Sequence, residues 1–320
     1  MWNAFMVYCS YVLTRITGNP IHLGMPVSLA IEPTTSCNLR CPECPSGRRS
    51  FTRSAGQIDF EHFQDFVDQL SRHITYLNLY FQGEPYLHPE FFRLVKYSHE
   101  KNIYTAASTN AHFLSSEFAK ETVLSGLNRL LISLDGLDQE TYASYRVGGE
   151  LNKVIEGIRQ VMYWKKKLRS KTPYVILQFL VFKTNEHQIE EVKSFAKEMG
   201  VDHVQIKSAQ FYDFEEGNPL MTGIQKHARY RKTANGSYTI KSKLPKHCWR
   251  MWSSAVITWD GKVLPCCFDK DADHILGLLE EDGFSKIWKG KPYRAFRKAI
   301  FSNRGQIDIC KNCTEGLRHT

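Results

Sequence analysis

The sequence predicts an α/β protein, a partial (βα)6 TIM-like barrel followed by a small cysteine-rich extension. Three features of the chain carry this prediction. Between residue 26 and about residue 210, short runs of β-branched and aromatic residues alternate with helical patterns. A polar, basic stretch then interrupts the alternation. Five of the nine cysteines lie beyond that stretch, in a compact unit at the end of the chain.

Six segments of the first part are predicted to be strands. They are residues 27–32 (VSLAIE), 74–81 (ITYLNLYF), 103–108 (IYTAAS), 129–134 (RLLISL), 174–182 (YVILQFLVF) and 203–208 (HVQIKS). Apolar runs of this length are typical of strands that are buried in a sheet.

Helices are predicted between these strands. Apolar residues recur at helical spacing within residues 60–70, 115–124, 154–162 and 189–196. Asp59 is a suitable N-cap for the first helix, and Gly126 and Gly200 follow the ends of the second and fourth. About six strand–helix units favour parallel strands with right-handed crossovers, and six fall short of the eight of a closed barrel. Ligands are then expected at the C-terminal ends of the strands.

The composition is that of a globular protein. The chain has 320 residues, of which 42% are hydrophobic, enough for a sizeable core. It contains no run of 18 or more apolar residues, so no segment is expected to span a membrane and no membrane partner is expected. The odd number of cysteines and their clustering favour metal ligation in a reducing cytoplasm over a disulfide framework. A cytoplasmic location is therefore predicted.

We divide the chain into four segments. Residues 1–25 are predicted to form an amphipathic helix packed on the main body, because the short apolar run lacks the basic start and the cleavage site of a signal peptide. Residues 26–212 form the partial barrel. Residues 213–247 form a basic linker or a substrate-facing loop, and residues 248–320 form the cysteine-rich extension.

Three cysteines lie directly after the first predicted strand. Cys37, Cys41 and Cys44 have the spacing Cys-x3-Cys-x2-Cys. A structural zinc ion would need a fourth ligand and usually takes paired Cys-x2-Cys elements. The observed spacing instead suits a cubane iron–sulfur cluster, in which one loop supplies thiolates to three irons. The fourth iron would then be open to a ligand that is not part of the protein.

At this motif the sequence resembles the radical S-adenosylmethionine (SAM) enzymes, and the resemblance covers residues 26 to about 210. It implies that SAM chelates the open iron of a [4Fe–4S] cluster through its amino and carboxylate groups. It also implies that an electron from the cluster cleaves SAM to a 5′-deoxyadenosyl radical, which takes hydrogen from the substrate. An electron donor such as flavodoxin or ferredoxin is therefore an expected partner.

Three further strand ends carry the resemblance. Residues 82–85 (QGEP) stand where the family has a GGEP-like element, residues 108–110 (STN) end the third strand, and residues 133–136 (SLDG) end the fourth. The resemblance implies SAM contacts from Gly83, Glu84, Pro85, Ser108, Asn110, Ser133, Asp135 and Arg146. Each element taken singly could be an ordinary turn or loop cap. Their occurrence in order, each at a strand end, favours the family.

Two residues depart from the family's pattern. Gln82 replaces the first glycine of the GGEP-like element. Glu43 precedes the third cysteine, at a position that is usually aromatic in the family and lies near the adenine of SAM. The adenine contact is therefore expected from elsewhere in the chain.

A second set of cysteines lies in the last quarter of the chain. It comprises Cys248, Cys266, Cys267, Cys310 and Cys313, with the spacings Cys248-x12-Gly261-x4-Cys266 and Cys310-x2-Cys313. Residues 256–267 (VITWDGKVLPCC) are predicted to form a β-hairpin that turns at Asp260 and Gly261. The hairpin would bring one of the adjacent cysteines beside Cys248.

This second set resembles the SPASM or twitch extensions that hold auxiliary iron–sulfur clusters in many radical SAM enzymes. A full SPASM extension carries more cysteines than the five found here. Neighbouring residues of a strand point to opposite faces, so Cys266 and Cys267 are not both expected to ligate one cluster. We predict one auxiliary [4Fe–4S] cluster, held by Cys248, Cys266, Cys310 and Cys313, with Cys267 as the alternative to Cys266. A zinc ribbon, which four thiolates also satisfy, is the other interpretation.

The excess positive charge is concentrated in one segment. The formal net charge is +9, and eight basic residues but no acidic ones lie between Glu216 and Asp260. This segment could line the entrance for an anionic small molecule or peptide, or it could be a solvated connector. No recognisable RNA-binding module accompanies it, so nucleic acid is not an expected partner.

These features predict an enzyme that abstracts hydrogen from a peptide or a small polar, sugar-like substrate, with the auxiliary cluster assisting oxidation or electron transfer. A catalytic base is not assigned. Asp213, Glu215 and Asp269 are candidates, and each could equally be a surface acid. The alternative is a non-catalytic iron–sulfur or zinc-binding scaffold that partners another protein.

Overall fold

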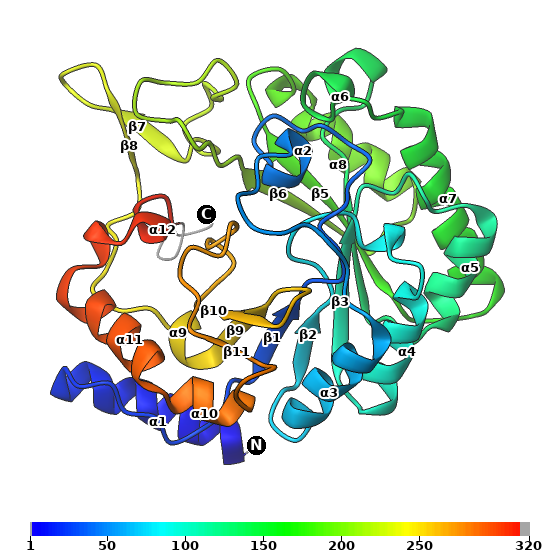
Figure 1. The fold of residues 1–320 in the computed structure, drawn as a ribbon. Helices are drawn as coiled ribbons and strands as arrows, with labels where there is room; N and C mark the ends of the chain where they lie inside the picture. The colour runs from blue at the N-terminus through cyan, green and yellow to red at the C-terminus, as the bar shows by residue number, and fades with distance from the viewer. Residues whose placement is uncertain (1, 314–320) are drawn as a thin grey trace.

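The computed structural model describes residues 2–313, and its central feature is a single large sheet (Figure 1). Six of its strands are β1 (Ser28–Ile31), β2 (Tyr76–Asn78), β3 (Tyr104–Thr109), β4 (Arg129–Ser133), β5 (Tyr174–Val181) and β6 (His203–Ser208). They pair in chain order, and every pair is parallel. The predicted partial (βα)6 barrel is therefore confirmed.

Helices cover the outer face of these strands (Figure 1). They include α3 (Phe60–Leu70), α4 (Phe91–Glu100), α5 (Ser116–Leu124), α7 (Leu151–Lys167) and α8 (Ile189–Glu198). Asp59 caps α3 as predicted, because its carboxylate accepts a hydrogen bond from the backbone of His62. The sequence prediction missed α4, although Phe91, Leu94 and Val95 form a buried stripe at helical spacing.

The cysteine-rich extension continues the same sheet. β9 (Ser254–Ile257) pairs in parallel with β1, β10 (Lys262–Leu264) pairs antiparallel with β9, and β11 (Gly277–Leu278) lies at the edge. The predicted hairpin is confirmed, and Gly261 in its turn has a φ of 75°, which favours glycine. Because β9 joins β1, the sheet runs without a break through the predicted boundary at residue 248.

The extension also contains several short helices, and some of them lie beside the N-terminal helix (Figure 1). These helices are α9 (Arg250–Ser253), α10 (Phe284–Lys289), α11 (Lys291–Asn303), η3 (Arg304–Gln306) and α12 (Asp308–Lys311). The helix predicted within residues 1–25 is present in the structure as α1 (Trp2–Thr17). Residues 314–320 of the predicted extension lie outside the described residues. Within residues 2–313, no helix combines the length and the apolar character needed to cross a membrane.

The basic segment has more structure than a linker. β7 (Tyr230–Lys232) and β8 (Tyr238–Ile240) form an antiparallel hairpin that stands apart from the main sheet (Figure 1). Tyr230 and Ile240 are buried, together with Phe211, in a small cluster that also contains Cys41. The basic segment is therefore packed against the loop that carries the first cysteines.

Candidate active site

The loop that carries the first three cysteines is closed at its base by a buried ion pair. Arg53 makes two hydrogen bonds to Glu32, at 2.6 and 2.8 Å, and the Glu32 side chain is fully buried. Burial raises the pKa of Glu32, while the hydrogen bonds and charge of Arg53 oppose that rise. The Ile58 N–H also donates to the Pro33 carbonyl at 2.9 Å. Both ends of the loop are thus fixed.

Replacing Arg53 with methionine should lower the free energy of unfolding by about 3–5 kcal/mol, because it leaves the Glu32 carboxylate buried without a counter-charge. Anaerobic chemical denaturation would measure this loss. Arg93→Met is the matched control, because Arg93 pairs with Glu90 at the surface. That change should cost no more than about 1 kcal/mol. Equal losses in the two variants would contradict a special role for the buried pair.

Cys37, Cys41 and Cys44 lie together at the C-terminal end of the barrel. All three thiols are free, and they share a cluster with Leu39 and Phe182. Burial, followed by smaller contributions that include the neighbouring Cys44 and Cys41, raises the pKa of Cys37 to about 12. Three converging thiols on one loop fit the donor set of an iron–sulfur cluster, which takes the thiolate form of cysteine.

Two polar side chains point N–H groups at these sulfurs. Arg146 Nη1 lies 3.9 Å from Cys41 Sγ, and Asn110 Nδ2 lies 4.0 Å from Cys37 Sγ. Hydrogen bonds to cluster sulfurs are one of the means by which a protein tunes such a cluster. The structure therefore brings two of the residues predicted to contact SAM to the cysteine loop.

The turn after β2 docks directly on the cysteine loop. The backbone N–H of Gly83 donates to Ser46 Oγ at 2.8 Å, and that of Glu84 donates to the Ser36 carbonyl at 2.7 Å. Gly83 has a φ of 74°, and a Cβ there would lie 2.3 Å from the Thr34 carbonyl oxygen, so only glycine fits. Ser46 Oγ also lies 3.5 Å from Gln82 Oε1, so the glutamine is part of the same contact.

Glu84 joins the ends of two neighbouring strands. Its carboxylate accepts hydrogen bonds from Thr109 Oγ1 and from the Asn110 backbone, both at 2.7 Å, and from the Tyr86 backbone at 3.2 Å. Burial raises the pKa of Glu84 to about 7, although these donors oppose the rise. Pro85 is also buried, at the start of the short helix η1 (Pro85–Leu87). The structure thus places Glu84 and Pro85 beneath the cysteine loop.

Asp135 and Arg146 form a second buried ion pair. Arg146 Nε donates to Asp135 Oδ2 at 2.6 Å, and the Leu180 N–H donates to Asp135 Oδ1 at 2.7 Å. Burial opposes the charged form of Arg146, but the Asp135 carboxylate and the Cys41 thiol raise its pKa well above the usual value. In this arrangement both Asp135 oxygens are used within the protein, and they orient Arg146 toward Cys41. Ser133 is buried at the end of β4, and Ser108 is half-buried near the end of β3.

Glu43, the unexpected residue of the loop, has a role that the sequence did not reveal. Its two oxygens accept hydrogen bonds from the Tyr212 N–H and from Asn218 Nδ2, both at 3.0 Å. Tyr212 and Asn218 follow β6, so Glu43 ties the cysteine loop to the start of the basic segment. An aromatic side chain could not make this link.

The second set of cysteines converges around Arg304. Cys248, Cys310 and Cys313 are buried, and Arg304 Nη2 lies 3.0 Å from Cys313 Sγ. Arg304 interacts electrostatically with all three thiols, and its buried Nε–H has no partner among the described residues. An orphaned donor beside several cysteines fits an anionic cluster whose sulfurs can accept a hydrogen bond.

The two adjacent cysteines have different neighbours. Besides Cys267 itself, the thiols that influence Cys266 are those of Cys248 and Cys310. Cys267 is instead influenced by Arg250, then Cys313 and Lys270. Cys266 is half-buried and Cys267 is exposed, and the choice of Cys266 as the ligand stays a prediction. Among residues 2–313, no three Cys, His, Asp or Glu side chains are arranged to hold a single metal ion.

Comparison with known families identifies the superfamily of the chain. Residues 31–196 match the Radical SAM superfamily. The chain belongs to the radical SAM superfamily. Residues 248–314 match the SPASM family, described as an iron–sulfur cluster-binding domain. This radical SAM protein is therefore an enzyme whose cofactors are SAM and a [4Fe–4S] cluster, with a SPASM domain that binds auxiliary iron–sulfur clusters, and the scaffold alternative is not supported.

Several known proteins are similar to this chain over most of its length. The mycofactocin maturase MftC of Mycobacterium ulcerans is 31% identical over 319 residues, which cover 90% of this chain and 83% of the relative. The structure of BtrN in complex with AdoMet and 2-DOIA has a TM-score of 0.59 at 18% identity, covering 92% and 96% of the two chains. Streptococcus suis SuiB bound to precursor peptide SuiA has a TM-score of 0.67 at 16% identity, covering 92% and 72%.

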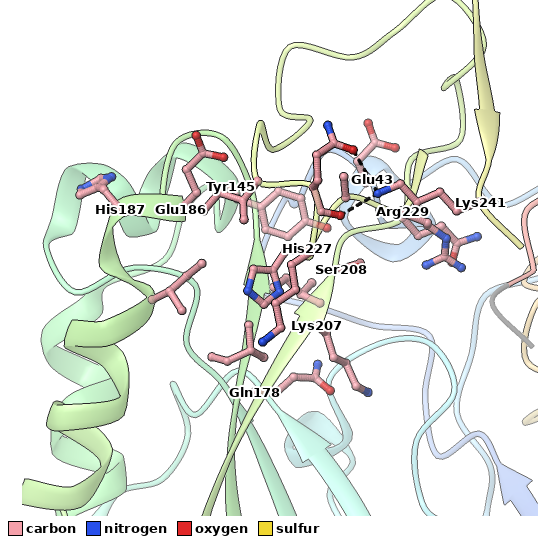
Figure 2. A pocket seen from close by; sticks show the side chains of 18 of the residues that line it. Glu43, Tyr145, Gln178, Glu186, His187, Lys207, Ser208, His227, Arg229 and Lys241 are labelled. Atoms are coloured by element: carbon pink, nitrogen blue, oxygen red, sulfur yellow. Dashed lines mark hydrogen bonds between the residues drawn. The ribbon is translucent and has the colours of Figure 1, made fainter. Parts of the chain in front are cut away.

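A cavity of about 1040 Å³ opens beside the cysteine loop of this radical SAM enzyme (Figure 2). Gln178 of β5, Lys207 and Ser208 of β6, Tyr145 of α6 (Gln139–Tyr145) and Glu43 line it. Residues of the basic segment line a further part of the cavity, and so does Lys270 of the extension. The cavity, which we name the central chamber, is thus lined by residues of both the first cysteine loop and the extension.

Positive charge dominates the walls of the central chamber. Its basic residues are Lys193, Lys207, Lys226, Arg229, Lys241, Arg250 and Lys270, and its acidic residues are Glu43, Glu186 and Glu190. Burial lowers the pKa of Lys207 and of Lys270, and neither side chain has a hydrogen bond or ion pair to another residue within 2–313. Half-buried ammonium groups without a paired carboxylate favour an anion in the chamber.

The three candidate bases do not lie in the central chamber. Asp213 and Glu215 line a neighbouring cavity of about 530 Å³. Asp269 is fully buried, and its oxygens accept hydrogen bonds from the backbones of Asp273 and His274 at 2.8 and 3.0 Å. Its carboxylate therefore holds a turn of the extension.

Proposed function

We propose that the protein cleaves SAM reductively at a [4Fe–4S] cluster held by Cys37, Cys41 and Cys44, and acts on a peptide or small polar substrate in the central chamber. The observation that carries this proposal is the position of the chamber between Glu43 of the first cysteine loop and Lys270 of the extension. When bound, SAM and the cluster supply a 5′-deoxyadenosyl radical that abstracts hydrogen. An auxiliary cluster at Cys248, Cys266, Cys310 and Cys313 assists oxidation or electron transfer.

The residues of the chain organise this site. Asp135 orients Arg146 toward Cys41, and Glu84 fixes the backbone of Asn110, whose side chain reaches Cys37. Such buried, hydrogen-bonded side chains hold reacting groups in place and keep water out. The SAM contacts therefore arise from Gly83, Glu84, Pro85, Ser108, Asn110, Ser133, Asp135 and Arg146, with Glu84 and Asp135 acting mainly through their neighbours.

The chamber supports a substrate that carries negative charge. Lys207 and Lys270 offer ammonium groups without a salt bridge to a described residue, although Lys270 Nζ lies 4.9 Å from the centroid of the Tyr212 ring. The basic segment adds Lys226, Arg229 and Lys241. A volume of about 1040 Å³ suits a small polar molecule or part of a peptide. Both kinds of ligand occur in the similar structures, since BtrN is bound to 2-DOIA and SuiB to a precursor peptide. An electron donor such as flavodoxin or ferredoxin would serve this chemistry in the cytoplasm.

Anaerobic assays with SAM and dithionite should show the proposed reaction. The reconstituted protein should bind about eight irons, as two four-iron clusters require, and should form 5′-deoxyadenosine detectable by mass spectrometry. Carboxylated or phosphorylated candidate substrates should raise the rate above the level without substrate, and neutral analogues should not. Absence of 5′-deoxyadenosine from protein with full iron content would overturn the function. Equal stimulation by neutral analogues would overturn only the charge preference.

A further inference from the structure

One face of α1 is apolar and exposed to solvent. Trp2 is 73% exposed, Phe5 55%, Tyr8 58%, Leu13 39% and Ile16 75%. At 100° per residue, these side chains gather on the outer half of the helix, and the rings of Trp2 and Phe5 lie 5.6 Å apart. Large side chains exposed singly are ordinary, but a continuous apolar helix face marks an interaction surface.

The opposite face of α1, which packs on the protein, buries Val7 and Tyr11 but also carries polar side chains. Asn3 Oδ1 accepts a hydrogen bond from the Met25 backbone at 2.9 Å. Ser10 Oγ and Thr14 Oγ1 accept from the backbones of residues 23 and 21, at 2.8 and 3.0 Å. A helix at the surface of a water-soluble body normally buries its apolar side. In α1 large apolar side chains also face outward, which indicates an apolar medium on the outer side.

The surroundings of this face are positively charged. Residues 1–31 contain no acidic side chain, and none occurs between Gly283 and Ile307. The exposed basic residues of α10 and α11 are Lys286, Lys289, Lys291, Arg294 and Lys298. These two helices lie beside the segment that follows α1 (Figure 1), since Trp288 Nε1 donates to the Gly24 carbonyl at 3.0 Å. Arg15 of α1 adds one more positive charge.

We propose that the exposed face of α1, with the basic residues of α10 and α11, binds the surface of a membrane that contains anionic lipids. Trp and Tyr are favoured at the membrane–water interface, where an apolar helix face enters the headgroup boundary and basic side chains meet lipid phosphates. A second copy of the chain fits this face less well, because pairing would bring like charges together. The protein would then be a peripheral membrane enzyme, which revises the expectation of no membrane partner although no described helix spans a bilayer.

Vesicle flotation of the full, reconstituted enzyme tests this proposal. The protein should float with vesicles of phosphatidylcholine and phosphatidylglycerol, but not with phosphatidylcholine alone, and high salt should weaken the binding. The triple variant Trp2→Ser, Phe5→Ser, Ile16→Ser should lose flotation. Lys289→Gln with Arg294→Gln should weaken it about fivefold for each charge removed.

Matched controls separate this face from the rest of the surface. Tyr163→Ser on α7 removes a ring that is 52% exposed, and Lys197→Gln removes a surface charge of α8; neither should change flotation. Circular dichroism and 5′-deoxyadenosine formation should be unchanged in all variants, showing that the fold is intact. The proposal is overturned if the wild type does not float, if the triple variant floats equally, or if light scattering shows a dimer that the triple variant converts to a monomer.

Discussion

Replacing Cys41 with alanine should reduce 5′-deoxyadenosine formation to the level seen without dithionite. Cys41 is the most buried of the three loop cysteines, and Arg146 lies 3.9 Å from its sulfur. Without this thiolate, the loop has too few ligands for the SAM-binding cluster, so the iron content should fall from about eight to about four. Anaerobic iron analysis and mass spectrometry of the SAM products measure both effects.

Cys9→Ala is the matched control for this variant. Cys9 lies on α1, belongs to neither cysteine set, and is half-buried and free of a disulfide. Its replacement should leave both iron content and SAM cleavage unchanged. If Cys41→Ala still formed 5′-deoxyadenosine at the wild-type rate, the assignment of the first cluster to residues 37–44 would be wrong.

Replacing Cys310 with alanine should separate SAM cleavage from the conversion of substrate to product. Cys310 lies among Cys248, Cys313 and Arg304, away from the SAM-binding elements. The variant should retain part of the SAM cleavage but form no product from a substrate identified by the 5′-deoxyadenosine assay. Its iron content should also fall to about four, because four thiolates are needed for the auxiliary cluster.

The adjacent pair of cysteines offers a control within the same hairpin. Cys267→Ala should keep about eight irons, and Cys266→Ala should lose about four. The reverse result would assign the ligand to Cys267. Normal product formation by Cys310→Ala would contradict a redox role for the auxiliary cluster.

Much of the fold could be predicted because its signals are local. The six parallel strands have short apolar runs that a single sequence reveals, and the strand predicted at 203–208 coincides with β6. The pairing of β9 with β1 could not be predicted in this way. It joins residues more than 200 positions apart, and nothing in the hairpin sequence specifies its neighbour across the sheet.

In the site, too, motifs of consecutive residues could be predicted, whereas contacts between residues distant in sequence could not. The cysteine spacing and the strand-end elements could be read from the chain, and the structure brings Asn110 and Arg146 to the cysteines. The roles of Glu43 and Lys207 depend on partners or cavity walls that lie far away in sequence. The exposed apolar face of α1 was also missed, because a helical pattern does not specify which side chains the rest of the protein will cover.

The electron paramagnetic resonance spectrum of the dithionite-reduced protein, recorded with and without SAM, tests the central claim most directly. We predict that SAM changes the signal of one of two clusters, that this change persists in Cys310→Ala, and that it is absent in Cys41→Ala. A spectrum that SAM leaves unchanged, in protein that holds the iron of both clusters, would contradict an open iron at the loop of Cys37, Cys41 and Cys44.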